Sequence, residues 1–347
     1  MARQRKAHTK SRDGCLQCKE RHIRRLDLSC SFSAPTLATM PLNQESLADL
    51  ELLDFWYRHP LLPGPPDQDR ELKQSYAQLG FSHPYLLNSI LALVSLRRFG
   101  EGRARPCWYS RALAHQQAAI SRARPHFQHL DGDSTSHKAM LAFSTFTSLY
   151  AVVEPLHRPT GLSQACAFNP VDEFLHAVWL GRRTTAFVQQ HLRAVAFSDP
   201  FMAAKYSSND RQIGRCDLEA QFPQLRILRD AIRGGFDEGE QRAICLDAVE
   251  RIFACMRILV DDSRDNGPCI MVIFTWVNEV DRRFLDLCVA RQPVALVILA
   301  HFAALMSLNN GFWLLQHWPG VLLEYIQELL KDWGGHLLQW PREVIFR

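Results

Sequence analysis

The feature that most limits the fold of this chain is the spacing of its apolar residues, which recur every three or four positions. Between 240 and 260 they fall at Ile244, Val249, Ile252, Phe253, Met256 and Leu259. This period matches one face of an α-helix. Similar runs begin at 46 and 84 and cover 108–123, 135–152, 171–190, 217–232, 269–289, 293–316 and 320–338. No Asn-Gly or Asp-Gly turn joins two alternating runs, so the hairpin signal is missing. The sequence predicts an all-α fold.

Proline and glycine residues mark the loops and helix ends between these runs. A Pro-rich loop spans 60–66, and Ser82 is a candidate N-cap for a helix with Pro84 in its first turn. Gly334 and Gly335 indicate a helix break. The longest apolar run, Val294 to Leu308, holds about fifteen residues, fewer than the ~18 that a membrane span needs. We therefore expect a core helix there and no membrane span.

Charge is distributed unevenly along the chain. The whole sequence carries +4, but residues 1–25 hold nine Lys/Arg against two acidic residues, which leaves −3 for the other 322. The basic residues of this arm are Arg3, Arg5, Lys6, Lys10, Arg12, Lys19, Arg21, Arg24 and Arg25. A leading basic arm is typical of a contact with nucleic acid.

Three of the ten cysteines, Cys15, Cys18 and Cys30, lie within sixteen residues. Two residues between Cys15 and Cys18 allow both thiolates to bind one tetrahedral metal ion. A redox CxxC motif usually lies within a βαβ pattern, and nothing in the sequence here indicates one. The other seven are predicted to be reduced, buried apolar side chains: Cys107, Cys166, Cys216, Cys245, Cys255, Cys269 and Cys288.

Three segments follow from these patterns. Residues 1–32 form a basic, Cys-containing DNA-binding segment. Residues 33–46 are small, polar and Pro-bearing, which is typical of a linker. Residues 47–347 form the all-helical domain.

The arm KSRDGCLQCKERHIRR, residues 10–25, resembles the start of a fungal Zn₂Cys₆ cluster, and LDLSCSF, residues 26–32, resembles its end. The helical segments DLELLDFW, LGFSHPYLLNSILALVSL and FTWVNEVDRRFLDLC resemble the regulatory domain of the same fungal transcription factors. The same regulatory domain is also resembled by a fourth segment, PVALVILAHFAALMSLNNGFWLLQHWP. Among them the chain is similar to sterol uptake control proteins and to regulators of secondary-metabolite gene clusters.

This resemblance implies a nuclear regulator of RNA polymerase II genes, with zinc held by Cys15, Cys18 and Cys30. The residues that the resemblance implies would contact DNA are Lys10, Arg12, Lys19, Arg21, Arg24 and Arg25. It also implies a homodimer through the helical domain, because no sustained heptad repeat follows the arm. A hydrophobic effector such as a sterol is a further implication for that domain.

The middle of the family's cluster motif is missing. Arg25 stands where the third cysteine belongs, and Leu26 already resembles the far end of the motif. Three thiolates cannot ligate two tetrahedral zinc ions. Three explanations stay open: a short coding stretch lost through splicing or from the gene model, a natural isoform or degenerate paralogue without zinc-dependent DNA binding, or a single zinc held by the three cysteines and His22. A disordered basic arm with idle cysteines is the alternative for the site itself.

Other functional signals are weak. The stripe Trp313, Leu314, Leu315, Trp318, Leu322, Leu323 and Ile326 fits a ligand pocket or, more simply, core packing. His301 on its apolar helix is interpreted as a hydrogen-bonded core histidine. Nucleotide-binding, HExxH and Gly-x-Ser-x-Gly motifs are absent from the sequence, and no nucleophile has an identifiable base. We therefore expect no enzyme; a helical interaction protein without specific DNA binding is the competing hypothesis.

Overall fold

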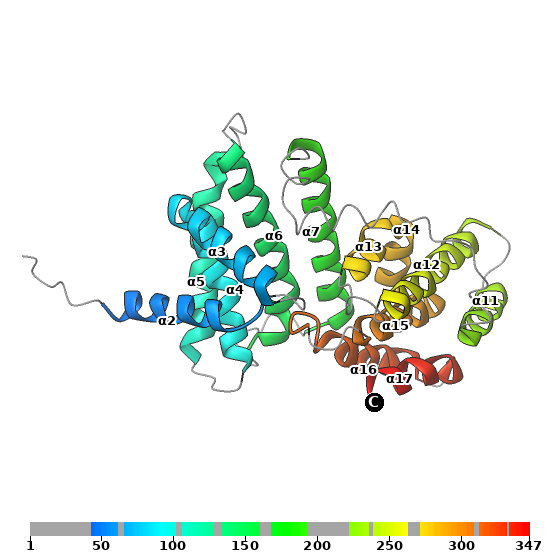
Figure 1. Cartoon of the computed structure of the whole chain (residues 1–347). Helices are drawn as coiled ribbons and strands as arrows, with labels where there is room; N and C mark the ends of the chain where they lie inside the picture. Colours follow the sequence, from blue (N-terminus) through cyan, green and yellow to red (C-terminus); the bar gives the residue numbers. More distant parts are fainter. Residues whose placement is uncertain are drawn as a thin grey trace, which may run out of the picture. The chain divides into compact units, whose positions relative to one another are not determined.

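The structure is a computed structural model, and it describes residues 43–61, 66–101, 106–127, 134–159, 168–192, 222–235, 239–262, 271–308, 312–331 and 333–347. Within these ranges every regular element is a helix, which confirms the all-α prediction (Figure 1). The chain divides into two units, Met1–Asp49 and Leu50–Arg347. Of the first unit only Asn43–Asp49 is described. There Asn43 Oδ1 accepts a hydrogen bond from Ser46 N at 2.7 Å, so α2 (Gln44–Arg58) begins within the predicted linker.

The first part of the second unit is built around α4 (Pro84–Gly100), which packs against α3 (Pro66–Ser82), α5 (Pro106–Ala123) and α6 (Ser134–His157). Its apolar run leaves Leu86, Ile90 and Leu96 fully buried. The two serines within this run stay in the core because Ser89 and Ser95 each donate to a carbonyl of their own helix at 2.7 Å. A short 3₁₀ turn, Arg124–Phe127, follows α5.

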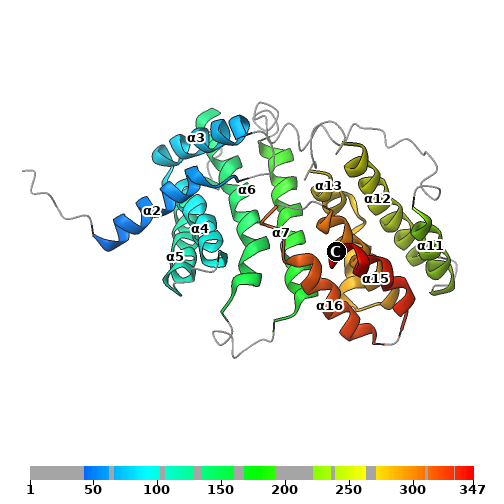
Figure 2. The same ribbon diagram turned by 60° about the horizontal axis from the view of Figure 1, so that its bottom comes forward.

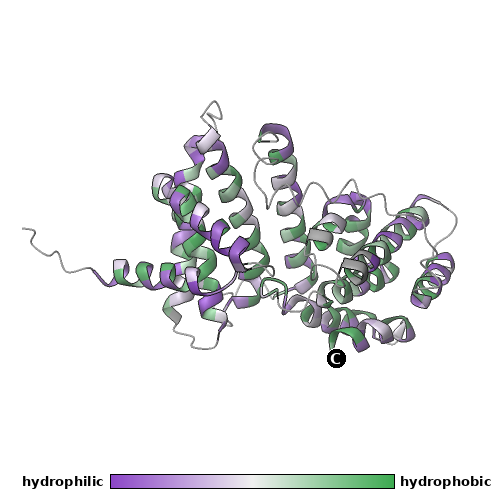
Figure 3. Cartoon of the chain, in the orientation of Figure 1, coloured by the Kyte–Doolittle hydropathy of each residue, from purple (hydrophilic) through white to green (hydrophobic). Residues whose placement is uncertain are grey.

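The last part is built around α15 (Pro293–Ser307), whose residues from Val294 to Met306 are all buried. It contacts α12 (Glu240–Asp262), α14 (Arg282–Val289), α16 (Trp318–Leu330) and α17 (Gln339–Ile345), as Figure 2 shows from a second side. α11 (Pro223–Gly235) lies against α12. Trp276, on α13 (Met271–Glu279), stacks on Phe302 of α15 with ring centroids 4.0 Å apart. Figure 3 shows hydrophobic residues, in green, running along α15.

Between these parts lies α7 (Pro170–His191), which contacts α6 on one side and α13, α14 and α16 on the other (Figure 1). Asn169 caps its start by accepting from Asp172 N at 3.2 Å. A second tie is the ion pair between Asp172 of α7 and Arg291, which follows α14, at 2.6 Å. Helix α7 therefore contacts both the part built around α4 and the part built around α15, and any cavity between the two parts would be lined by it.

Tryptophan side chains join helices by bonding to the main chain. The indole N–H of Trp318 donates to Val152 O of α6 at 2.7 Å, and that of Trp276 donates to Ala248 O of α12 at 3.0 Å. In the same way Trp56 donates to Lys73 O and Trp313 to Leu61 O, each at 3.3 Å. These bonds satisfy polar atoms that would otherwise be buried alone.

Three details differ from the sequence predictions. α3 was not expected, because its residues are largely polar and show little apolar stripe. Its last residue is Ser82, so the N-cap of α4 is His83 and the proposed cap by Ser82 is wrong. The single run predicted over 269–289 is two helices, because Asp281 begins α14 by accepting from Arg283 N at 2.9 Å.

Further along, α15 ends at Ser307 and not at 316 as predicted. The break at Gly334 and Gly335 is confirmed: Gly334 has φ 66°, where glycine is favoured, and a 3₁₀ turn over Gly335–Leu338 follows. Within the described ranges Cys245, Cys255 and Cys288 are buried as predicted, but Cys107 is exposed near the start of α5, so that part of the prediction is wrong. Burial raises the pKa of Cys245 and of Cys255 to about 12, so both thiols are protonated.

By length and composition α6 is apolar enough to cross a membrane, and α14 and α15, bent by 109°, pass the same test as a pair. Of the most apolar window of α6, 61% is buried against the rest of the protein. The core helix of a folded domain passes this test too, so the finding is weak evidence for a membrane span.

Candidate functional site

The residues predicted to bind zinc, Cys15, Cys18 and Cys30, lie outside the described ranges. So do the residues predicted to contact DNA: Lys10, Arg12, Lys19, Arg21, Arg24 and Arg25. Within the described ranges no group of three or more His, Cys, Asp or Glu residues could hold a metal ion. That result does not bear on the arm, whose zinc and DNA contacts stay predictions.

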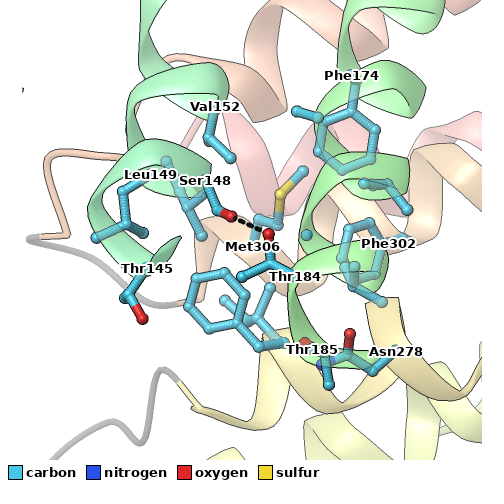
Figure 4. Close-up of a pocket in the computed structure, with 17 residues that line it drawn as sticks. Thr145, Ser148, Leu149, Val152, Phe174, Thr184, Thr185, Asn278, Phe302 and Met306 are labelled. Atoms are coloured by element: carbon cyan, nitrogen blue, oxygen red, sulfur yellow. Dashed lines mark hydrogen bonds between the residues drawn. The ribbon is translucent and has the colours of Figure 1, made fainter. Parts of the chain in front are cut away.

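The described residues form a partly open cavity of about 80 Å³ between α6, α7, α13 and α15 (Figure 4). Helix α6 lines it with Thr145, Ser148, Leu149 and Val152. Helix α7 contributes Phe174, Ala177, Val178, Gly181, Thr184 and Thr185. The remaining wall comes from Ile273, Phe274, Val277 and Asn278 of α13, from Phe302 and Met306 of α15, and from Leu315. The cavity thus lies where the two parts of the second unit meet along α7.

One wall of the cavity carries a pair of hydroxyl groups that bridges α6 and α7 (Figure 4). Ser148 Oγ lies 2.8 Å from Thr184 Oγ1, and Ser148 Oγ also donates to Ser144 O at 3.0 Å. A hydroxyl has one proton to donate and can accept twice. Because Ser148 donates its hydroxyl proton to Ser144 O, Thr184 is the donor in the hydrogen bond between the two hydroxyl groups. Lone pairs of both oxygens then remain available for a hydrogen bond from a third group.

Thr145 adds a third hydroxyl on the same wall, and its proton also goes to the main chain: Thr145 Oγ1 donates to Leu141 O at 3.0 Å. The polar part of the lining is therefore rich in acceptors. Asn278 is the member with an amide, which both accepts and donates.

No charged side chain belongs to the described lining. The closest basic group by sequence is Arg182, whose Nη2 donates to the main-chain oxygen of the lining residue Asn278 at 3.0 Å and whose guanidinium lies 5.8 Å from the ring of Trp179. Nη1 of Arg182 is buried and has no hydrogen-bond partner among the described residues. Arg282 lies 5.0 Å from the same ring. Burial lowers the pKa of Arg182, with Asp281 acting in the opposite direction. The described side chains that line the cavity are therefore uncharged, and the Arg182 guanidinium behind Asn278 is a nearby cation.

Gly181 of α7 lines the cavity without a side chain. A Cβ added there would meet no atom within 4 Å, and its backbone is helical. Glycine within a helix costs about 1 kcal/mol relative to alanine. Gly181 thus lowers the stability of α7 at a position where a larger side chain would extend into the cavity.

The stripe that fitted either core packing or a ligand pocket is mainly core, as the simpler interpretation predicted. Trp318, Leu322, Leu323 and Ile326 are fully buried, and of the whole stripe only Leu315 lines this cavity. His301 is confirmed as a core histidine, 1% exposed, whose Nδ1–H donates to Val297 O at 2.9 Å. The sequence signal that could have indicated the real cavity is a glycine inside the apolar run of α7, three residues before Thr184.

A second cluster of polar groups lies where α5, α6 and α7 approach one another. Glu154 accepts from Tyr109 at 2.5 Å and from Arg158 at 2.8 Å, and Arg158 also donates to Glu173 at 2.9 Å. Burial tends to raise the pKa of Glu154, but the hydrogen bonds from Arg158 and Tyr109 outweigh it, so the pKa is lowered. Because these groups are satisfied by one another, the cluster is best explained as a structural tie.

No protein-family model matches the chain, and neither the curated proteins nor the solved structures contain a match.

Proposed function

We propose that this protein is a transcription regulator that contacts DNA through its basic arm, while the helical domain binds partners or a small effector. The observation that supports this proposal best is the coincidence of two sequence features. Residues 1–25 hold a net charge of +7 in a chain that is otherwise slightly acidic, and the same segment carries the CLQCK pattern of fungal zinc-cluster proteins.

The proposed chemistry of the arm is electrostatic first. Arginine and lysine side chains release counterions from the phosphate backbone, which gives affinity without sequence preference. Lys19, Arg21 and Arg24 are the residues proposed to add contacts to base edges, because they follow the first cysteine pair. Zinc, where it is bound, would be held by Cys15, Cys18 and Cys30 and would order this segment. The proposed location is the nucleus.

The second candidate is an interaction protein without specific DNA recognition, which would associate with complete relatives through its helices. It is favoured by the missing cysteines of the arm. Salt dependence separates the two candidates, since a loose basic arm loses nearly all affinity as salt rises, whereas a specific complex keeps its preferred sequence.

The deciding experiment is a fluorescence anisotropy titration of the full chain with a pool of genomic duplexes and then with any enriched duplex, between 50 and 200 mM salt. We expect one duplex to be preferred at the upper salt concentration. Arg21→Ala with Arg24→Ala should weaken that binding at least tenfold. The matched control is Arg70→Ala with Arg233→Ala, two exposed arginines of the helical domain, which should bind as the unaltered chain does.

Equal affinity for all duplexes, disappearing by 200 mM salt, would reject specific recognition and favour the interaction protein. A repeat after removal of zinc with a chelator then reports whether the three cysteines matter. Unchanged binding without metal would show that the arm acts as charge alone.

A further inference from the structure

We infer that the cavity between α6, α7, α13 and α15 binds a small, uncharged alcohol with a compact apolar body. This inference concerns the helical domain and does not depend on DNA contact by the arm, so its test and the DNA-binding test fail independently. Three observations carry it: the arrangement of hydroxyl protons, the absence of charge from the described lining, and the size of the cavity together with Gly181.

The hydrogen-bonding pattern selects for a donor. Thr184 gives its proton to Ser148, Ser148 gives its proton to Ser144 O, and Thr145 gives its proton to Leu141 O. What the oxygens of Ser148 and Thr184 offer to a ligand is lone pairs. A ligand hydroxyl can donate to Thr184 Oγ1 and can also accept from the amide of Asn278, whereas a ketone or ether of the same size can only accept.

The absence of charge from this lining excludes ionised ligands. A carboxylate or ammonium that enters an apolar site without a partner loses several kcal/mol of hydration. The rest of the lining is aliphatic and aromatic and includes Phe174, Phe302 and Met306 (Figure 4). These side chains favour a hydrocarbon body, and Met306 is flexible enough to adapt to its outline.

Size limits the ligand further. A cavity needs about 10–15 Å³ to hold one water molecule, so about 80 Å³ corresponds to roughly six waters, or ~180 Å³ of liquid volume. That is the space of an alcohol with about six carbon atoms. A tetracyclic sterol is several times larger and would project from the cavity. The space inside the cavity therefore matches a ligand smaller than the sterol that the sequence resemblance implies.

The test uses the full chain and the primary alcohols from butanol to decanol, with dissociation constants from ligand-observed NMR. Affinity should rise about fourfold per added methylene, the value expected for burying one such group, up to about six carbons. Beyond that length the gain should become small, because further methylenes stay in water. Hexanoate at neutral pH should bind at least tenfold more weakly than hexanol.

Two variants separate binding in the cavity from weak association elsewhere. Gly181→Leu places a side chain in the empty space beside α7 and should abolish hexanol binding while the protein stays folded. Gly234→Leu is the matched control, since a Cβ at that exposed position of α11 also meets no atom within 4 Å, and it should bind hexanol normally. Thr184→Val should weaken hexanol about three- to tenfold, and Thr184→Ser should restore it.

Contrary outcomes are equally specific. Hexanol binding that survives Gly181→Leu would overturn the assignment of the site. An affinity that keeps rising to decanol, or displacement of hexanol by ergosterol with Gly181→Leu blocking both, would overturn the size limit. No detectable binding of any alcohol would mean that the cavity holds only water, and the inference would be wrong.

Discussion

His301 shows how far one residue can depart from its ordinary chemistry in this fold. It lies on the most apolar helix, 1% exposed, and its ring stacks on Trp340 with centroids 5.5 Å apart. Burial lowers the pKa of His301 to about 4, and the one opposing influence is the hydrogen bond to Val297 O. No charged side chain contributes to the shift. The imidazole is therefore neutral at physiological pH and contributes to the core as an aromatic group.

This residue should make the stability of the domain sensitive to acid. Between pH 6.5 and about pH 4 the unfolded chain binds a proton at His301 that the folded chain does not. Stability is therefore complete above pH 6.5 and decreases as pH falls, by about 3 kcal/mol at pH 4. Urea unfolding at pH 7 and pH 4.5 measures the loss.

His301→Gln is the companion variant, because its amide can still donate to Val297 O but does not titrate. We expect it to lose clearly less stability than the unaltered chain over the same pH interval. An identical pH dependence in both proteins would contradict a buried neutral histidine. His157, whose pKa is also lowered by burial, should account for part of the remaining slope.

At the scale of single elements, the end of α2 depends on a buried cation from α3. Lys73 is 4% exposed and its ammonium group lies 2.6 Å from Asp69 Oδ2. It also donates to Tyr57 O at 3.3 Å and to His59 O at 3.1 Å, at the end of α2 where carbonyls lack helical partners. Asp69 in turn accepts from Leu61 N at 2.8 Å. One ion pair thus fixes both the helix end and the start of the following loop.

Lys73→Met should consequently destabilise the domain by about 3–5 kcal/mol, because it leaves a buried carboxylate without its cation. The matched control is Arg58→Ala. Its ion pair with Asp54 has the same i,i+4 spacing, but the two side chains are 72% and 56% exposed, so the loss should stay below about 0.5 kcal/mol. Thermal or urea unfolding of both variants compares them, and similar losses would contradict the role given to Lys73.

Helices with a clear apolar stripe were predictable from the sequence, and those without one were not. The 240–260 prediction agrees with α12 to within two residues, because its buried positions repeat at helical spacing. Helix α3 was not predicted because its buried residues include Lys73 and Gly80, which do not belong to an apolar pattern. The break between α13 and α14 was not predicted because a single capping side chain, that of Asp281, interrupts an otherwise continuous apolar run. The cavity could not be predicted, since Ser148, Thr184 and Asn278 come together only through tertiary packing.

At the scale of the whole helical unit, the important junction is the one between the part around α4 and the part around α15. Besides α7, it is joined by Trp318 of α16, which bonds to Val152 O of α6 and packs edge-on against Phe174, with ring centroids 5.3 Å apart. Val152 and Phe174 also line the cavity. A ligand in the cavity would therefore touch the same side chains that hold the two parts together.

Trp318→Phe should destabilise the domain by about 1–3 kcal/mol, because Val152 O loses the donor that reaches it from α16. Trp333→Phe, at a side chain 42% exposed, is the control and should change stability by less than about 0.5 kcal/mol. Calorimetric unfolding compares the two. Equal effects would show that the indole bond does not matter to the junction.

The tryptophans that bond to carbonyls have a consequence for how such a chain can vary in evolution. Every residue type has a main-chain oxygen, so Trp318, Trp276 and Trp313 do not require valine, alanine or leucine at the positions they contact. Substitutions at Val152, Ala248 and Leu61 can accumulate without breaking the joints, while the indoles cannot be exchanged. Related chains should therefore keep these tryptophans at helix junctions long after the facing positions have drifted, and a comparison that weights all positions equally would lose sight of that shared framework early.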